Sequence, residues 1–186
     1  NSDTAVNLSF SISQDYYQLL HHDCHSLLAG MDCRLTVRFT PKRGGYRVAQ
    51  LTAEADVTSI PANSSRLFGL GMTRADSLTN VLGGDTNITW YTGGSADWQP
   101  INHGEGAQSG NIHHSEMSAL MAKISGEGRL QFEWSVSSER NPANHREPVD
   151  ALHLHQDGKH KNFINGELSF SGYALYLPEG EHSLIW

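Results

Sequence analysis

The segment GRLQFEWSVSSE, residues 128–139, decides the fold class of this chain. Apolar and polar residues alternate along it, with Leu130, Phe132, Trp134 and Val136 set between Gln131, Glu133, Ser135 and Ser137. Successive side chains of a β-strand point to opposite sides of a sheet, so this alternation predicts a strand with one dry face. The segment therefore predicts a strand in the core of a β-sandwich.

A second alternating run, DALHLHQDG at residues 150–158, follows after a polar loop. Leucine occupies one face of this run and histidine the other, at Leu152, Leu154, His153 and His155. Asp157-Gly158 is a turn signal. We therefore predict a second strand that ends at this turn.

The composition also favours β-structure, and it limits the partners. With 18 glycines in 186 residues and little helical periodicity, the chain is predicted to be all-β, as one large domain or two small ones. The formal net charge of −7 and the pI near 5.8 leave no basic surface for phosphate groups, so we expect no nucleic-acid partner. No apolar run is long enough to span a membrane, so we expect no membrane insertion.

The two cysteines, Cys24 and Cys33, stand nine positions apart and flank a loop that contains Gly30. In an oxidising compartment a disulfide between them would close this loop and stabilise the fold by about 2–3 kcal/mol. We favour this arrangement. The alternative is two reduced, partly buried thiols in a cytosolic protein.

Three further segments carry predictions about organisation. Residues 34–41 (RLTVRFTP) and 46–55 both alternate, and Gly44-Gly45 stands between them, so we predict a hairpin. The polar, glycine-rich residues 72–84 are predicted to be a linker or a domain entry. Residues 117–124 fit both helical and strand periodicity, and we predict a strand because glycines follow at once.

The first part of the chain resembles a known family. The resemblance lies in FSIS at residues 10–13, the two cysteines, LTVRFTP at residues 35–41, and LFGLG at residues 67–71. This order is similar to the C-terminal half of bacterial immunoglobulin-like repeats, the choice-of-anchor D modules of the ASPM and Hydin class. The resemblance implies a Cys24–Cys33 pair and an immunoglobulin-like β-sandwich over residues 1–71. The family's first strands are missing or shortened here.

The second part resembles another family of secreted bacterial modules. WYTGGSADW at residues 90–98, LQFEWSVSSE at 130–139, YALYLPEGEH at 173–182 and the final LIW follow in the same order as in MAM-like jelly rolls of the choice-of-anchor J and cleaved-adhesin type. The resemblance implies a jelly-roll β-sandwich over residues 72–186. Phe170 stands where a Trp is common, and the family continues beyond the position of Trp186.

Together the two resemblances imply a non-catalytic adhesion or display module, cut from a larger bacterial protein that is secreted or held at the cell surface. Its partners would be a protein or glycan surface and the other domains of its parent chain. The alternative is a carbohydrate-binding or substrate-binding accessory domain of a secreted hydrolase. The sequence contains no G-x-S-x-G, H-E-x-x-H or Walker motif, so we expect no catalytic residues in this chain.

Candidate metal ligands fall into three groups. MAM-like modules often hold structural Ca²⁺, a cation that prefers carboxylate and carbonyl oxygens, and the carboxylates nearest the matching motifs are those of Asp85, Glu139, Asp150 and Asp157. The cluster His21, His22, Asp23 and His25 has ligands for Zn²⁺ or Cu²⁺, although a solvated loop is the commoner outcome. His153 and His155 have a spacing that can hold a metal, although strand histidines are more often simply exposed to water.

Aromatic residues are the candidates for ligand binding. A Tyr or Trp ring stacks on the apolar face of a sugar and offers a polar tip, so Trp98, Tyr91 and Tyr176 are predicted to contact a ligand, with Tyr173 as a further candidate. The alternative is that these rings fill the sandwich.

Overall fold

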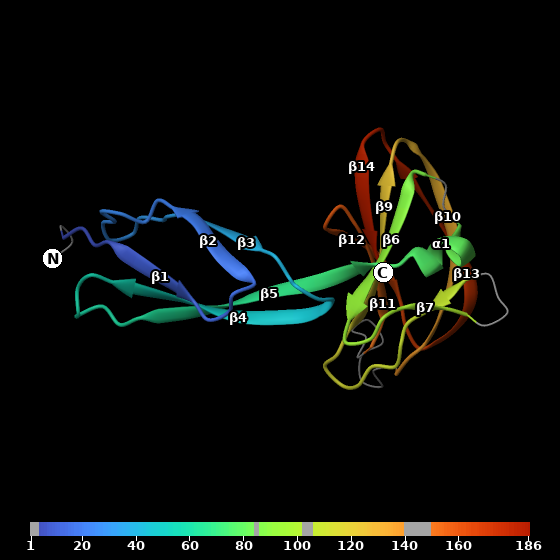
Figure 1. Cartoon of the computed structure of the whole chain (residues 1–186), viewed down its shortest axis with the longest axis horizontal. Coiled ribbons are helices and arrows are strands. Elements are labelled where there is room, and N and C mark those ends of the chain that lie inside the picture. The colour runs from blue at the N-terminus through green and yellow to red at the C-terminus, as the bar shows by residue number, and fades with distance from the viewer. Residues whose placement is uncertain (1–3, 84–85, 102–105, 140–149) are drawn as a thin grey trace. The chain divides into compact units, whose positions relative to one another are not determined.

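The computed structural model describes residues 4–83, 86–101, 106–139 and 150–186. Almost all of the regular structure in these ranges is antiparallel β-sheet, which confirms the predicted all-β sandwich fold (Figure 1). The chain divides into two compact units, Asn1–Gly71 and Met72–Trp186. No helix in the described part is long and apolar enough to cross a membrane.

The first unit is built from five strands. They are β1 (Leu8–Ile12), β2 (Tyr17–His22), β3 (Leu35–Phe39), β4 (Gly45–Ala55) and the larger part of β5 (Asn63–Arg74). The strands form one sheet in the order β1-β4-β5 and a second of β2 and β3. Tyr17 and Phe39 of the β2–β3 sheet stack with ring centroids 4.7 Å apart, and the two rings lie against Gly69 of the other sheet.

Gly69 of β5 leaves room for these two rings between the two sheets of the first unit. A Cβ atom at Gly69 would lie 2.6 Å from both Phe39 Cζ and Tyr17 Oη, well inside contact distance. Because glycine has no side chain, the two rings lie directly against the backbone of β5. The Tyr17 hydroxyl also donates to the Arg47 carbonyl of β4 at 3.4 Å, which ties the ring to the opposite sheet.

The predicted hairpin of residues 34–41 and 46–55 is wrong. β3 pairs with β2, Tyr17 lying opposite Phe39, whereas β4 pairs with β1 and β5. The segment between β3 and β4 therefore carries the chain from one sheet to the other. Both strands have one apolar face in either arrangement, so alternation alone does not select the partner.

The second unit contains the end of β5 and the remaining elements. These are α1 (Asp76–Leu82), β6 (Ile88–Gly94), β7 (Gln99–Pro100), β8 (Ala107–Gln108), β9 (Ser118–Ser125), β10 (Gly128–Ser137), β11 (Leu152–Gln156), β12 (Lys159–Ile164), β13 (Glu167–Leu177) and β14 (Glu181–Ile185). The larger sheet of this unit has the order β5-β6-β9-β14-β11-β12, and β10 pairs with β13 in another sheet. The strands predicted within residues 117–124, 128–139 and 150–158 are confirmed as β9, β10 and β11.

An apolar core lies between these two sheets. Its buried residues come from α1, β6, β9, β13 and β14, and they are Leu78, Trp90, Leu120, Ala122, Ile124, Leu177 and Leu184. Leu130 of β10 and Leu175 of β13 pack against this cluster. The inward side chains of β10 and β13 thus close the sandwich, and their other face is turned outward.

Residues 72–84 were predicted to be a linker or a domain entry; they are not a linker, because they hold α1, and the second unit begins at Met72. Leu78 on α1 is fully buried, and both ends of the helix are tied to Trp90. The Ala75 N–H donates to the Trp90 carbonyl at 2.9 Å, and the Trp90 indole N–H donates to the Gly83 carbonyl at 2.9 Å. Seven residues are too few for a helix that is stable alone, so its packing on Trp90 maintains it.

Candidate ligand-binding face

The outer face of the β10–β13 sheet offers the most exposed aromatic surface of the second unit. β10 and β13 pair in antiparallel register, with Leu130 and Leu175 facing the core. The intervening positions face away from it, as cross-strand pairs: Arg129 with Tyr176, Gln131 with Ala174, and Glu133 with Gly172. We call this surface, together with Phe170, the β10–β13 face.

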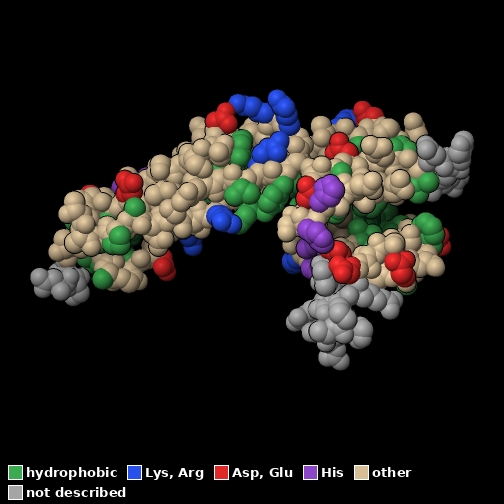
Figure 2. Space-filling view, turned by 90° about the horizontal axis from the view of Figure 1, so that it is seen from below, with side chains coloured by type: hydrophobic (Ala, Val, Ile, Leu, Met, Phe, Trp, Pro, Cys, Tyr) green, Lys and Arg blue, Asp and Glu red, His purple; other side chains and the backbone are tan. Residues whose placement is uncertain are grey.

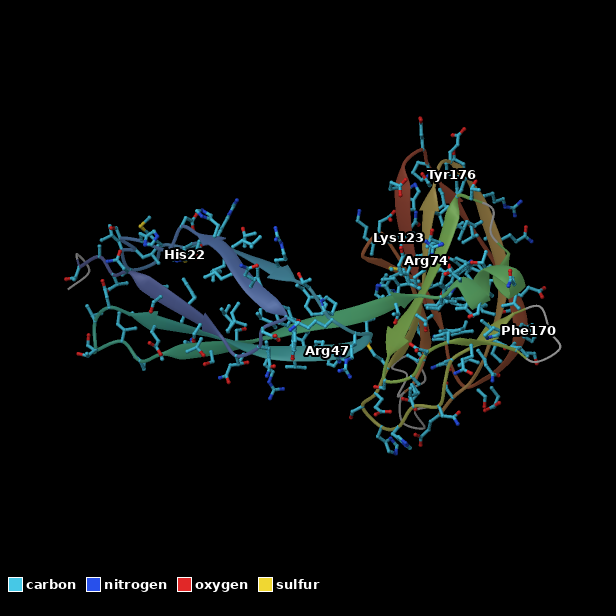
Figure 3. The ribbon with its side chains drawn as sticks, in the orientation of Figure 1. His22, Arg47, Arg74, Lys123, Phe170 and Tyr176 are labelled. Atoms are coloured by element: carbon cyan, nitrogen blue, oxygen red, sulfur yellow. A yellow bond between two sulfur atoms is a disulfide. The ribbon has the colours of Figure 1, made fainter. Side chains whose placement is uncertain are left out.

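Two exposed rings stand toward opposite ends of β13 on this face (Figure 3). Phe170 is 68% exposed and Tyr176 is 65% exposed. The six-residue separation corresponds to roughly 20 Å along a strand. Gly172 and Ala174 lie between the rings, so the surface between them is flat.

A β-bulge lies beside Phe170 on β13. Trp134 pairs with Ser171 and Val136 pairs with Leu168, so β13 has one more residue than β10 across this interval. Bulges change the direction of side chains and often lie beside binding sites. Phe170 lies on the same face as Gly172 and Tyr176 because even numbers of residues separate them, and beyond the bulge Leu168, which is 38% exposed, is opposite Val136.

Polar groups border the two rings. The Tyr176 hydroxyl donates to a Glu127 carboxylate oxygen at 3.4 Å, and Arg129, Gln131 and Glu133 are exposed along β10. The face therefore combines apolar rings for stacking with donors and acceptors for hydroxyl groups.

The other predicted ligand-binding residues lie elsewhere. Trp98 packs against the core, and its indole Nε1 is a buried polar atom without a hydrogen-bond partner among the described residues. Tyr91 is on β6, in the larger sheet, where Lys123 Nζ lies 5.5 Å from the centre of its ring. Tyr173 contacts Phe132 and Trp134. Of the four aromatics predicted from the sequence to contact a ligand, Tyr176 alone lies on the β10–β13 face.

In the described part of the chain, no three of the carboxylates predicted to bind Ca²⁺ form a close group. Asp85 lies outside the described residues. Glu139 follows Ser138, whose hydroxyl donates to the Asp150 carbonyl at 3.1 Å. Asp157 is at the other end of β11 from Asp150, roughly 20 Å away along the strand. One ion therefore cannot be bound by both of these aspartates.

The disulfide between Cys24 and Cys33 is confirmed. The disulfide also bears on metal binding at this position. Asp23, Cys24 and Cys33 bring together three atoms of the types that bind metal ions. Sulfur atoms in a disulfide are not thiolate ligands. One Asp23 carboxylate oxygen accepts the Arg34 N–H at 2.6 Å, which lowers the pKa of Asp23. The disulfide and this hydrogen bond therefore stabilise the local structure, and we do not assign a metal site to the group.

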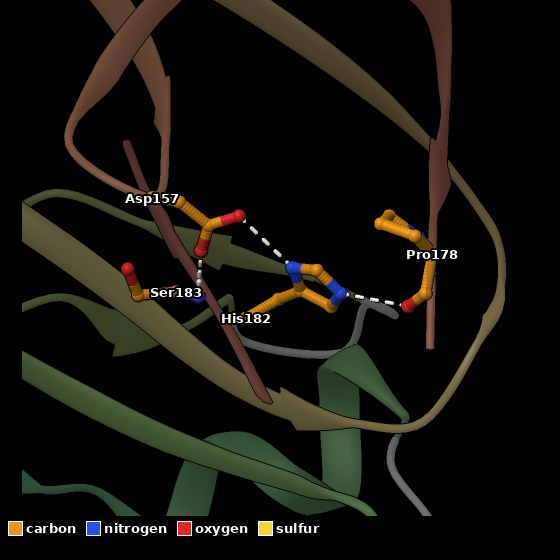
Figure 4. Close-up of polar contacts among 4 residues, drawn as sticks. All are labelled: Asp157, Pro178, His182 and Ser183. Atoms are coloured by element: carbon orange, nitrogen blue, oxygen red, sulfur yellow. Dashed lines mark hydrogen bonds and ion pairs between the residues drawn. The ribbon is translucent and has the colours of Figure 1, made fainter. Parts of the chain in front are cut away.

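A buried histidine, His182, and an exposed aspartate, Asp157, form a hydrogen-bonded pair that joins two turns of the second unit (Figure 4). His182 is 9% exposed, and its Nδ1 lies 2.9 Å from Asp157 Oδ2. Its Nε2 lies 2.8 Å from the Pro178 carbonyl oxygen, which can only accept a hydrogen bond. The other Asp157 oxygen accepts the Ser183 N–H at 2.8 Å. In a nucleophile-activating pair Nε2 would face a hydroxyl or a thiol, so this arrangement is suited to fastening.

This pair predicts a dependence of stability on pH. The hydrogen bond to Asp157 raises the pKa of His182, and the same bond lowers the pKa of Asp157. The histidine's contribution is therefore complete below its unfolded pKa of about 6.5 and is lost as the pH rises through the raised value. The aspartate's contribution is complete above about 3.9 and is lost as the pH falls through the lowered value.

We expect the free energy of unfolding of the wild type to exceed that of His182→Gln by more at pH 5.5 than at pH 9. Urea unfolding at both values measures the difference, and the other histidines cancel because both proteins contain them. A difference that does not change with pH would show that His182 is neutral in the folded state.

The fold and these contacts define the class of the chain as an all-β, disulfide-containing sandwich protein of two units. No protein-family model matches it, and no curated protein does. Among solved structures the chain is similar to the secreted serine protease VesC from Vibrio cholerae, with a TM-score of 0.59 and 15% sequence identity. The similarity covers 98% of this chain and 39% of that chain, and at this identity it shows the fold alone.

Proposed function

We propose that this chain is a non-catalytic, extracellular part of a larger secreted protein, and that its β10–β13 face binds a glycan. The observation that carries the proposal is the exposure of Phe170 and Tyr176 at the two ends of a flat strip of Gly172 and Ala174. A linear chain of sugar rings fits such a strip, because its apolar ring faces stack on the aromatics and its hydroxyls reach Arg129, Gln131 and Glu133.

The setting is supported by three further observations. The Cys24–Cys33 disulfide is typical of oxidising compartments, and the similar solved structure is that of a secreted protein. The formal net charge of −7 favours a neutral partner over a phosphate-rich one, and Figure 2 shows acidic side chains on each unit. We extend the proposal to a bacterial adhesion or display role, as the family resemblances imply.

A second candidate function is an accessory segment of a secreted hydrolase. The similarity to VesC favours it, because the similar region is a minor part of that protease's length. In this case the β10–β13 face would hold a polymeric substrate for a catalytic domain elsewhere in the parent chain. If this second function is correct, replacing Phe170 and Tyr176 should lower the activity of the parent enzyme on a polymeric substrate and leave its activity on a small substrate unchanged.

Binding of the full chain to a glycan array and to cell-wall polysaccharide tests the proposed function. We expect Phe170→Ala and Tyr176→Ala each to weaken the binding about tenfold or more, since an exposed aromatic anchor commonly contributes over 1 kcal/mol. Phe68→Ala is the matched control, because Phe68 is 57% exposed and lies in the first unit. Glycan binding that survives both substitutions, or binding to a protein and to no glycan, would contradict the proposal.

A further inference from the structure

The β11–β12 hairpin places three histidines on one face of the larger sheet. Its turn consists of Asp157 and Gly158, which have φ values of 52° and 75°, as a tight two-residue hairpin turn requires. The turn sets Gln156 opposite Lys159 and His155 opposite His160. His153 is two residues before His155 and therefore lies on the same face.

Two of these histidines already face each other. His153 Nδ1 lies 3.2 Å from His160 Nε2. The ring centre of His155 is 5.2 Å from that of His160 and 6.5 Å from that of His153. His153 and His160 are exposed and His155 is partly exposed, so a cation reaches all three from solvent.

A second β-bulge supports the orientation of His153. Leu154 pairs with Asn162 and His155 pairs with His160, so Lys161 is the extra residue of β12. The bulge brings Phe163 opposite His153, and the two rings stack with centroids 5.7 Å apart and an interplanar angle of 30°. The aromatic ring covers one side of the imidazole and limits its rotation.

The distance between the two nitrogens fits joint coordination of one cation. With metal–nitrogen bonds of 2.0–2.1 Å, two ligands of a tetrahedral zinc ion lie about 3.3 Å apart. The observed 3.2 Å is close to this value. Without a metal, one of the two facing nitrogens donates a hydrogen bond to the other. On coordination, the shared proton moves to the other nitrogen of its own ring, so no proton need be released.

We propose that His153, His155 and His160 form a surface site for a late first-row divalent cation, Zn²⁺ or Cu²⁺. His153 and His160 bind through the two nitrogens that already face each other, and His155 completes the set by rotation of its side chain. Water fills the remaining position. Imidazole nitrogens select these metals over Ca²⁺, which requires oxygen ligands, so this site differs from the calcium group predicted from the sequence.

Calorimetric titration of the full chain at pH 7.5 with ZnCl₂, CuCl₂ and CaCl₂ tests the site. We expect one Zn²⁺ or Cu²⁺ per chain at the tightest site and no Ca²⁺ binding there, with Cu²⁺ tighter than Zn²⁺. His160→Ala and His153→Ala should each weaken binding at least tenfold, because even loss of a supporting contact costs about 10–100-fold. The matched control is the double variant His113→Ala/His114→Ala, which removes an exposed histidine pair outside the hairpin.

Nuclear magnetic resonance of the wild type gives a second readout that does not depend on the folding of a variant. On addition of Zn²⁺, the imidazole nitrogen signals of His153, His155 and His160 should shift together at one equivalent. The proposal is overturned when the wild type binds neither metal, when the His113/His114 control loses as much affinity as His160→Ala, or when the three signals do not move. Glycan binding is measured separately, so failure of this site leaves the proposed function unaffected.

Discussion

Replacing both Cys24 and Cys33 by serine is expected to lower the free energy of unfolding of the first unit by about 2–3 kcal/mol. The disulfide closes a short loop, so its removal gives the unfolded chain more conformations. Cys24 is also fully buried, and a serine hydroxyl there would have to find a hydrogen-bond partner. Guanidinium unfolding followed by far-ultraviolet circular dichroism measures the loss.

The distribution of tryptophan shows which unit responds. All four tryptophans, Trp90, Trp98, Trp134 and Trp186, lie in the second unit, so tryptophan fluorescence follows that unit alone. We expect the fluorescence transition to stay at the wild-type denaturant concentration while part of the dichroism transition moves to a lower one. The wild type under reducing conditions should match the variant. Equal movement of both signals would contradict a stabilisation confined to the first unit.

The disulfide and many of the strands could be predicted from the sequence because their signals are local. Alternation over residues 130–136 fixes the dry face of β10, and the Asp157-Gly158 pair fixes the end of β11. Strand partners depend instead on contacts distant in sequence. In the first unit, β3 pairs with β2, and the rings of Tyr17 and Phe39 on these strands pack against Gly69 of β5. No local sequence pattern encodes this packing.

The candidate site was predictable in part for the same reason. Tyr176 follows the regular alternation of β13 and could be selected as an outward ring. Phe170 has the same phase in that alternation, but it lies beside a bulge that the sequence does not mark. Trp98 is of a residue type that often contacts sugar ligands, but it packs against the core. His160 was missed although a signal existed: a two-residue turn at Asp157-Gly158 places position 160 directly opposite His155.

Leu78→Ala is expected to lower the free energy of unfolding of the second unit by about 2–5 kcal/mol, the usual range for a buried leucine. Leu78 is fully buried in the cluster that contains Trp90, Leu120 and Leu184, so the shorter side chain leaves a cavity beneath α1. If residues 72–84 were a linker, the same substitution would change stability by less than about 0.5 kcal/mol. Urea unfolding followed by tryptophan fluorescence distinguishes the two values.

Asn80→Ala provides the matched control within α1. Asn80 is exposed on the same helix, and alanine is the better helix former, so this substitution should be neutral or slightly stabilising. A loss of similar size in both variants would mean that disturbance of the helix backbone, and not the cavity, is responsible. A small loss for Leu78→Ala alone would mean that α1 does not close the core. Leu78 would then contribute little to the stability of the second unit. The two hydrogen bonds between Trp90 and the ends of α1 would have to hold the helix in place.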